Sequence, residues 1–118
     1  MVAEQGDVYW VRLAAPIGSE PGYTRPCVII QNNVMIKSRI NTILVCTISS
    51  NLKLTNAPGN VLLAEGEANL DKSSVVNVSQ VVTVNKVSLL EKIGHLSQQR
   101  VIEIISGLHL LIDPKDTI

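Results

Sequence analysis

The apolar residues of this chain come in short runs of Val, Ile and Leu, and this pattern restricts the fold more than any other feature. The chain has no Phe and only 3% aromatic residues, so its core must be built from β-branched and aliphatic side chains, which favour strands. The runs at 25–32 and 41–48 are apolar on both faces and should be well buried. Runs of strand length lie at 8–13, 25–32, 41–48, 61–64, 75–84 and 89–96.

Turn-forming and polar residues separate these runs. Residues 14–24 contain two Pro and two Gly, and Pro21-Gly22 suits the centre of a type II turn. We expect residues 33–40 to form a hairpin loop, and 49–60 and 65–74 to form polar loops. Strands at this spacing predict a small closed or half-closed barrel.

One stretch near the C-terminus has a helical period. Ser97 is a suitable N-cap, and Asp113-Pro114 should end the helix because the residue before a proline disfavours the α region. The fold class expected is therefore mainly β with one C-terminal α-helix. The residues predicted to form the apolar face of this helix are Val101, Ile104, Ile105, Leu108, Leu111 and Ile112.

The length of 118 residues fits a single domain, 1–118, in which we expect 113–118 to be a loose tail. The N-terminus does not resemble a signal peptide, and no apolar run approaches the ~18 residues of a membrane span, so we expect a cytoplasmic protein with no membrane partner. Cys27 and Cys46 each lie in an apolar run, and their spacing fits neither a zinc site nor a cytoplasmic disulfide.

The charges of the chain sum to zero but are unevenly distributed. Between residues 21 and 64 lie Arg25, Lys37, Arg39 and Lys53, with no Asp or Glu. A local positive field of this kind could guide an anionic substrate. Four scattered bases on a solvated surface explain the same sequence equally well, and the pattern alone does not choose between the two.

The two histidines, His95 and His109, lie in different predicted elements, so a two-histidine acid/base mechanism has little support. We expect one to lie at the surface and the other to be a partly buried structural residue. Glu65, Glu67 and Asp71 share one loop, where acidic residues are usually solvated. The sequence therefore predicts no metal site and no cofactor.

The segment 18–26 contains the strongest candidates for catalytic and binding side chains. It leads Ser19, Glu20, Tyr23 and Arg25 from a turn directly into a buried strand, and Pro26 holds Arg25 in an extended conformation. A guanidinium fixed at the start of a strand is well suited to clamp a phosphate. The simpler alternative is an edge arginine paired with Glu20.

A hairpin between 25–32 and 41–48 could bring a second polar residue to Arg25. If paired residue numbers sum to 72, Arg25 faces Thr47, and Cys27 and Cys46 point to opposite faces. A slip of one residue would turn the strand over. A shift of two residues remains compatible with the sequence.

These features together resemble the MazF/PemK-type toxins, which are mRNA interferases. The similarity covers residues 6 to about 112, and the ordered set with its spacing is much more specific than any one motif. The motifs that carry it are Gly6-Asp7-Val8-Tyr9-Trp10, Gly18-Ser19-Glu20, Arg25-Pro26, Val28-Ile29-Ile30-Gln31-Asn32, Thr47, Ser79-Gln80-Val81 and Ile93-Gly94-His95-Leu96-Ser97.

The resemblance implies an SH3-like barrel, a homodimer and sequence-specific cleavage of single-stranded RNA. It implies that Arg25 and Thr47 are the catalytic pair, with Ser19, Glu20 and Gln80 near the active groove. Many family members carry a basic residue shortly after the glutamine, where this chain has Val82. The corresponding phosphate contact is either missing here or supplied by Lys53.

Such a site needs no metal, because the 2′-hydroxyl of RNA is itself the nucleophile. Arg25 and Thr47 would stabilise the phosphorane, and Glu20 is retained as a candidate base, since arginine keeps its proton in proteins. Tyr23, in the predicted loop, is the better candidate for base stacking, because one of Tyr9 and Trp10 should be core. The expected partners are single-stranded RNA, a second copy of the chain and a cognate antitoxin with an acidic, disordered segment.

Two alternatives remain open. A toxin of the same barrel type could bind DNA gyrase and cut nothing, although the C-terminus here lacks the terminal Trp-Gly-Ile of such relatives. The second alternative is a non-catalytic SH3-like module that binds RNA or peptides. Such a module would not require Arg25 and Thr47 to come together.

Overall fold

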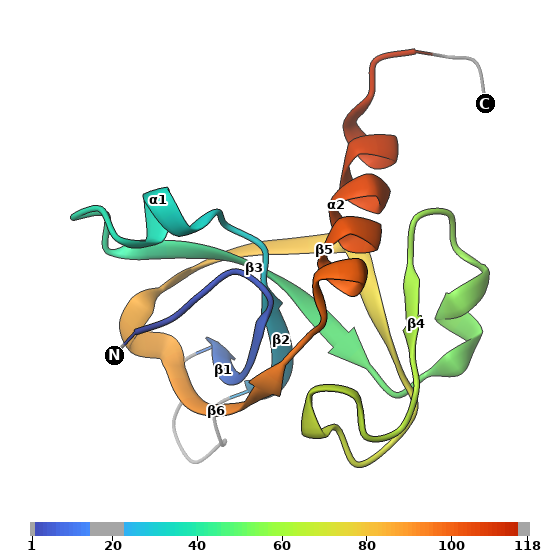
Figure 1. The fold of residues 1–118 in the computed structure, drawn as a ribbon, viewed down its shortest axis with the longest axis horizontal. Coiled ribbons are helices and arrows are strands. Elements are labelled where there is room, and N and C mark those ends of the chain that lie inside the picture. Colours follow the sequence, from blue (N-terminus) through green and yellow to red (C-terminus); the bar gives the residue numbers. More distant parts are fainter. Residues whose placement is uncertain (1, 15–22, 116–118) are drawn as a thin grey trace.

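The computed structural model describes residues 2–14 and 23–115, and within them six strands form one antiparallel sheet. The sheet has the order β4-β5-β3-β2-β1-β6 and curls into a half-barrel with one long helix against it (Figure 1). The expected fold class, mainly β with a C-terminal helix, is confirmed. The elements are β1 (Asp7–Ala14), β2 (Tyr23–Ile29), α1 (Asn33–Ile36), β3 (Thr42–Ser49), β4 (Val61–Leu63), β5 (Ser74–Asn85), β6 (Leu89–His95) and α2 (Gln98–Ile112).

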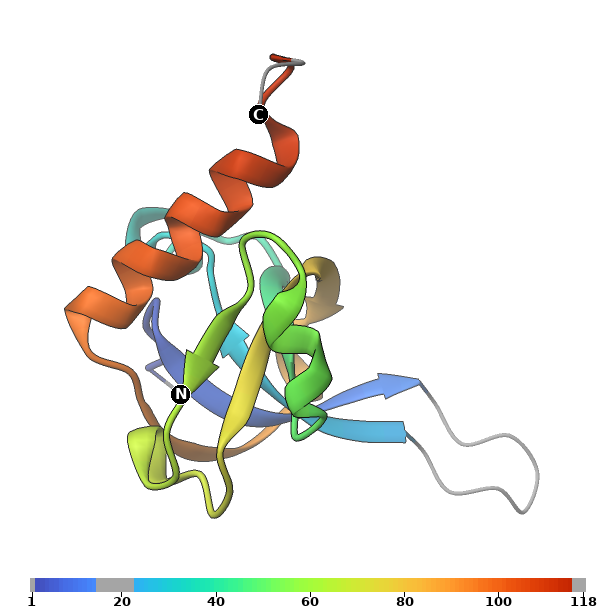
Figure 2. The same ribbon diagram turned by 90° about the vertical axis from the view of Figure 1, so that its right-hand side faces the viewer.

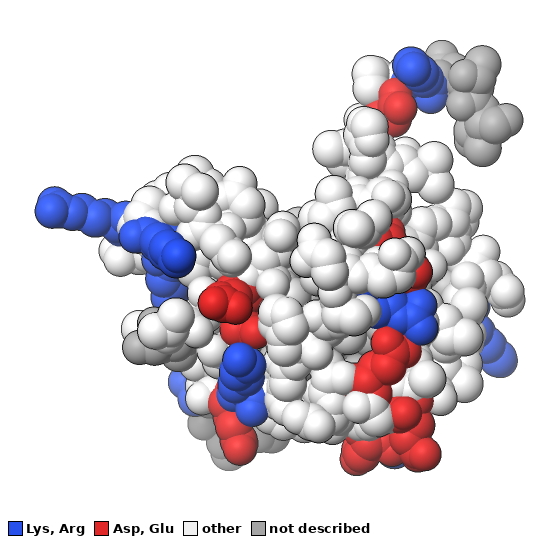
Figure 3. All heavy atoms as spheres, viewed as in Figure 1, with Lys and Arg blue, Asp and Glu red and all other residues white. Residues whose placement is uncertain are grey.

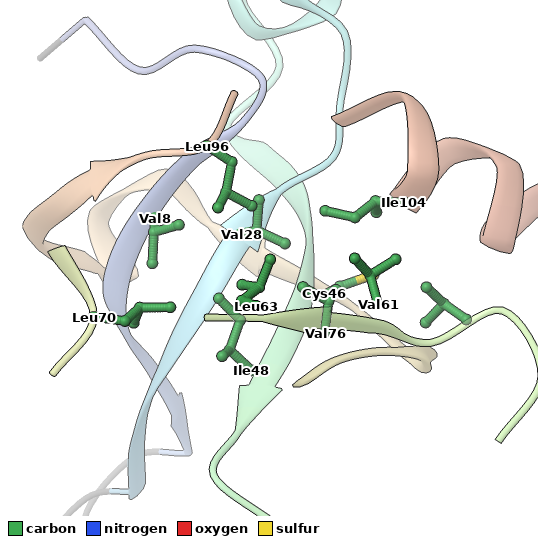
Figure 4. Close-up of a cluster of buried hydrophobic side chains, with 11 residues drawn as sticks. Val8, Val28, Cys46, Ile48, Val61, Leu63, Leu70, Val76, Leu96 and Ile104 are labelled. Carbon is green, nitrogen blue, oxygen red and sulfur yellow. The ribbon is translucent and has the colours of Figure 1, made fainter. Parts of the chain in front are cut away.

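The central strands bury both of their faces, as the doubly apolar runs predicted. One cluster, drawn in Figure 4, includes Val28 and Cys46. A second cluster on the other face includes Cys27 and Val45. Neighbouring residues of a strand point to opposite faces, so the alternation divides each run between the two clusters. The prediction that the two cysteines point to opposite faces is confirmed, and both are free.

The predicted register of the β2–β3 hairpin is wrong by two residues. Cys27 pairs with Thr47, and Val28 pairs with Cys46, so paired numbers sum to 74 rather than 72. Arg25 therefore does not face Thr47 directly. A shift of two preserves which face each side chain occupies, and for this reason the apolar pattern could not distinguish the two registers.

The connection between these strands is more than a hairpin loop. Residues 33–36 form the single helical turn α1, whose N-cap Asn32 accepts a hydrogen bond from the Met35 backbone N–H. The ammonium of Lys86 donates to the Ile36 carbonyl at 2.7 Å and so supplies one of the partners that a helix end lacks. The polar loop 49–60 likewise contains a 3₁₀ helix, Leu52–Asn56.

Helix α2 begins as predicted, with the Ser97 hydroxyl accepting from the Arg100 backbone N–H. Its first ten residues pack on the barrel through Val101, Ile104 and Gly107. Its last turn projects beyond the sheet (Figure 1), and the predicted apolar face is only partly buried. The exposed apolar residues of α2 are Ile102, Ile105, Leu110, Leu111 and Ile112.

No helix in the described residues is long and apolar enough to cross a membrane. The predicted turn at Pro21-Gly22, and the side chains of Ser19 and Glu20, lie outside the described residues. On either side of that segment, the end of β1 and the start of β2 extend together out of the body (Figure 2).

Candidate active site

Arg25 lies on this extended hairpin, where β2 pairs with β1. Its partner across the pair is Val11, and Pro26, which follows it, pairs with Trp10. The guanidinium carbon of Arg25 lies 5.2 Å from the centre of the Tyr23 ring, within cation–π range. No acidic side chain of the described residues forms an ion pair with Arg25. The charge is thus held against an aromatic ring without being neutralised there.

Thr47 is 3% exposed and bonded to the predicted RNA-binding residue Gln80. The Thr47 hydroxyl donates to Oε1 of Gln80 at 2.9 Å. An irregularity in β5 brings the glutamine there. Cys46 pairs with Val81, but Thr47 pairs with Asn77, so residues 78–80 are left over between the two pairs. A bulge of this kind re-aims side chains, and here it directs Gln80 onto the threonine.

Arg25 and Thr47 are diagonal neighbours on one face of the sheet. Thr47 lies opposite Cys27, and Arg25 is two residues from Cys27 on the same strand, so all three side chains project from the same side. The Cα atoms of such diagonal pairs are roughly 7–8 Å apart. The two groups are therefore close enough for one phosphate, although the Thr47 hydroxyl is nearly buried and could reach the phosphate only if the phosphate replaced Gln80 as its acceptor.

The basic stretch between residues 21 and 64 does not form one patch. Lys37 and Arg39 follow α1, at the far end of β2 from Arg25, whereas Lys53 lies in the 3₁₀ helix that follows β3, near the Arg25 end. On the face drawn in Figure 3, basic and acidic atoms are interspersed rather than gathered in one field. Only Arg25 and Lys53 of the four remain candidates for contact with one anion.

A cavity of about 680 Å³ adjoins this end of the sheet. Arg25 and Pro26 form part of its wall, together with Trp10 on β1 and Asn51 after β3. The opposite wall comes from the segment 69–74. Sequence reasoning missed this cavity because the segment that closes it is distant along the chain.

The structure also shows which of the first two aromatic residues, Tyr9 or Trp10, lies in the core. Tyr9 is 5% exposed and belongs to the core, whereas Trp10 is 42% exposed and lines the cavity. Alternation along β1 required one of the two to point inward, but it could not say which. Tyr23 is exposed, as the prediction of a stacking role requires.

The model of the family described as PemK-like, MazF-like toxins of type II toxin–antitoxin systems matches residues 4–112. The chain belongs to the PemK/MazF toxin family. The family predicted from the sequence motifs is thereby confirmed.

Relatives within the PemK/MazF family match over nearly the whole chain. Endoribonuclease MazF6 of Mycobacterium tuberculosis is 36% identical over 113 residues, which are 96% of this chain and 99% of that protein. Endoribonuclease MazF of Staphylococcus epidermidis is 36% identical over 106 residues, 90% of this chain and 88% of that protein. These relatives also bear out the predicted enzyme class.

Solved structures of the PemK/MazF type share the fold. MazF of Deinococcus radiodurans superposes with a TM-score of 0.72 at 21% identity, covering 95% of this chain and 97% of that one. An endoribonuclease from a mycobacterial species, described as a complex with its cognate antitoxin, gives a TM-score of 0.77 at 16% identity over 98% and 99% of the two chains. At such identities the likeness shows the fold alone.

The departure from the PemK/MazF pattern at Val82 has a structural counterpart. Val82 is partly buried and packs against the second core cluster, together with Leu13. An apolar residue at this position therefore contributes to the core of this chain, and it offers no charge to a phosphate.

The Gly6-Asp7 motif has a structural role. Asp7 is fully buried, and its carboxylate lies 2.6 Å from Nδ1 of His95 and 3.3 Å from the Lys92 ammonium. Gly6 has a φ of +94°, and a Cβ there would lie 2.9 Å from Val101. These contacts join the N-terminal segment to β6 and α2. His95 and His109 are both exposed, so the prediction that one of the two histidines is partly buried is wrong, although His95 pairs with the buried Asp7.

In the described part of the chain, one group of side chains has the arrangement of metal ligands, namely Glu4, Asp7 and His95. Asp7 already accepts from the Glu4 backbone N–H and contacts both His95 and Lys92. The group lies at the start of β1, four residues before the partner of Arg25. A metal held there would be separate from the Arg25–Thr47 site.

Proposed function

We propose that this chain cleaves single-stranded RNA at short specific sequences without a metal, by attack of the substrate's own 2′-hydroxyl. The observation that carries the proposal is the shared face of Arg25 and Thr47, where a guanidinium without an acidic partner among the described residues lies diagonal to an oriented hydroxyl. Family membership supports the RNA-cleaving activity.

In the proposed reaction the O2′–P bond forms and the P–O5′ bond breaks. The 2′-hydroxyl loses a proton to a base, negative charge collects on the non-bridging oxygens, and the O5′ leaving group takes up a proton. Arg25 would stabilise that charge by a bidentate contact. The Thr47 hydroxyl, held by Gln80, would donate to a non-bridging oxygen by exchanging its present acceptor for the phosphate. The products are a 2′,3′-cyclic phosphate and a 5′-hydroxyl.

Glu20 is our proposed base. A positioned base contributes ~10²–10⁴-fold to rate and one charge-stabilising donor ~10²–10³-fold, and because these ranges are similar the magnitudes alone do not identify the base. Ser19, Tyr23, Lys53 and Gln80 complete the proposed RNA-binding set. Tyr23 would stack on a base while its ring also supports Arg25.

We further propose that the chain acts in the cytoplasm as a homodimer controlled by a cognate antitoxin. One structural relative is described as bound to such an antitoxin. An acidic, partly disordered segment that folds over Arg25 and Thr47 would imitate the charge of RNA. RNA and antitoxin should then exclude each other, and Arg25→Ala should weaken both complexes. Simultaneous binding would contradict a shared groove.

The mechanism is tested by removing the nucleophile from the substrate. A cleaved RNA is first mapped, and a second RNA is made that carries a single 2′-deoxy nucleotide on the 5′ side of the cut. We expect this RNA to remain intact at that bond, while a 2′-deoxy nucleotide three positions away has no such effect. Cleavage of the deoxy-substituted bond would show that the nucleophile comes from water or from the protein.

A further inference from the structure

We propose that the cavity beside Arg25 holds an unpaired base of the RNA, stacked on Trp10 and read by Asp71. This proposal rests on the proposed function, which it extends to base recognition. The cavity, at about 680 Å³, lies within the size range of ligand pockets. Its wall includes Trp10, Arg25, Asn51, Asn69, Asp71 and Lys72.

Trp10 provides the flat surface. It is the one tryptophan of the chain, and it is 42% exposed although it lies in the middle of β1 between the buried Tyr9 and Val11. Trp10 pairs with Pro26, so its ring projects to the opposite face of the β1–β2 pair from Arg25, but both residues line the cavity at this end of the sheet. A base on the indole would therefore belong to a nucleotide whose backbone passes around the strand edge to the phosphate that Arg25 contacts. Stacking on aromatic side chains is the usual way in which proteins hold splayed bases.

The facing wall is held in shape by contacts far apart in sequence. The Asn69 side-chain N–H donates to the Ile93 carbonyl at 2.9 Å. The Arg100 guanidinium donates to both carboxylate oxygens of Glu67, at 2.8 and 2.9 Å. Ala68 and Asn69 have φ values of +50° and +61°, which residues other than glycine adopt infrequently. This conformation persists because β6 and α2 both secure it, and a secured wall costs less to order on binding.

The polar groups of the wall fit a base better than an acidic peptide. Asp71 is exposed, and no ion pair or hydrogen bond of its carboxylate is found within the described residues. A carboxylate accepts from the exocyclic amino group of a base, whereas it would repel an acidic chain. Lys72, beside it, offers a charge to a flanking phosphate. We therefore infer a preference for an amino-bearing base, cytosine, adenine or guanine, over uracil at the nucleotide next to the cut.

Binding can be observed directly, because Trp10 is the sole source of tryptophan fluorescence. The full chain is titrated with 2′-O-methyl hexanucleotides of cytosine, adenine, guanine and uracil, which cannot be cleaved, and with an abasic hexamer of equal charge. We expect saturable quenching by at least one amino-bearing oligomer and little by the uracil or abasic oligomers. Equal responses to all five probes, or none, would overturn base stacking on Trp10.

Variants separate the roles of the two residues. Trp10→Leu should bind the best oligomer about 5- to 100-fold more weakly, and Trp10→Phe should retain most of the affinity. Asp71→Asn should reduce discrimination between that oligomer and the uracil oligomer by about 5- to 100-fold. Glu65→Gln, a nearby exposed acid that does not line the cavity, is the matched control. Unchanged binding and discrimination in Trp10→Leu and Asp71→Asn would contradict the proposal.

Cleavage of a long RNA by the same proteins distinguishes this proposal from the proposed function. A wild-type chain that cuts RNA while Trp10→Leu and Asp71→Asn cut the same sites at the same rates would remove the base pocket and leave the nuclease. A wild-type chain that cuts no RNA would remove the nuclease itself. Quenching of Trp10 by an acidic peptide, but by no oligonucleotide, would assign the cavity to a protein partner instead.

Discussion

At the scale of single residues, Arg25 and Thr47 carry the proposed chemistry. Arg25→Ala and Thr47→Ala should each lower the cleavage rate by at least ~100-fold, through loss of a charge-stabilising donor. The double variant should lose less than the product of the two, because both groups act on one phosphate. Initial rates on a mapped RNA provide the measurement.

Arg39→Ala is the matched control for this pair of variants, because Arg39 is exposed and lies at the opposite end of β2. It should cleave like the wild type, and circular dichroism should show the same fold for all variants. Near-normal rates in Arg25→Ala, or an equal loss in Arg39→Ala, would refute a specific role for Arg25.

Cys27 and Cys46 lie in two separate core clusters, and burial raises the pKa of each thiol to about 12. Since the thiolate is the reactive form, neither cysteine should react with Ellman's reagent at pH 8 in the native protein. Both should react promptly in guanidinium chloride. Rapid labelling of the folded chain would mean that the core opens far more often than this packing implies.

At the scale of elements, the contacts between α2 and the 67–69 segment are the clearest test of how the cavity wall is held. The Arg100 guanidinium lowers the pKa of Glu67 below its ordinary value. The folded state thus binds fewer protons than the unfolded state, so this contribution is present at neutral pH and is lost as the pH falls through about 4. The free-energy difference of unfolding between wild type and Arg100→Gln should therefore shrink between about pH 6 and pH 3. Urea unfolding at several pH values measures it, and a difference independent of pH would contradict the ion pair.

The start of α2 offers a second test at this scale. Ser97→Ala removes the acceptor of the Arg100 backbone N–H and should lower the free energy of unfolding by about 1 kcal/mol. Ser106→Ala, in the exposed middle of the same helix, should change it little. Because alanine favours a helix interior more than serine does, a similar loss from both substitutions would contradict a specific role for the Ser97 cap.

At the scale of the whole molecule, the order and type of the main elements could be predicted from the sequence. Turn residues separate the apolar runs of strand length, and the change from a strand-like to a helical spacing of apolar residues identifies α2. The register of β2 and β3 could not be predicted, since a shift of two leaves every side chain on its own face. The exposed end of α2 has the same apolar period as its buried start, so the pattern alone could not reveal where the packing stops.

For the candidate site too, some features could be predicted from the sequence and others could not. Arg25 and Thr47 follow from motifs, but their diagonal relation depends on the register, and the Thr47–Gln80 contact depends on the irregularity at residues 78–80. The cavity beside Trp10 depends on contacts between residues 67–69 and the distant β6 and α2. Local sequence carries no signal for such contacts, so the catalytic pair was easier to predict than the surface that would select its substrate.

The central claim is that the RNA supplies the nucleophile and the protein supplies the charge, without a metal. Cleavage of a long RNA by the purified chain in excess EDTA, followed by analysis of the new ends, tests this most directly. We predict undiminished cleavage, with 2′,3′-cyclic phosphate and 5′-hydroxyl ends, and no cleavage of DNA of the same sequence. Activity that disappears with the chelator and returns with added magnesium, or products with 5′-phosphate ends, would contradict the account.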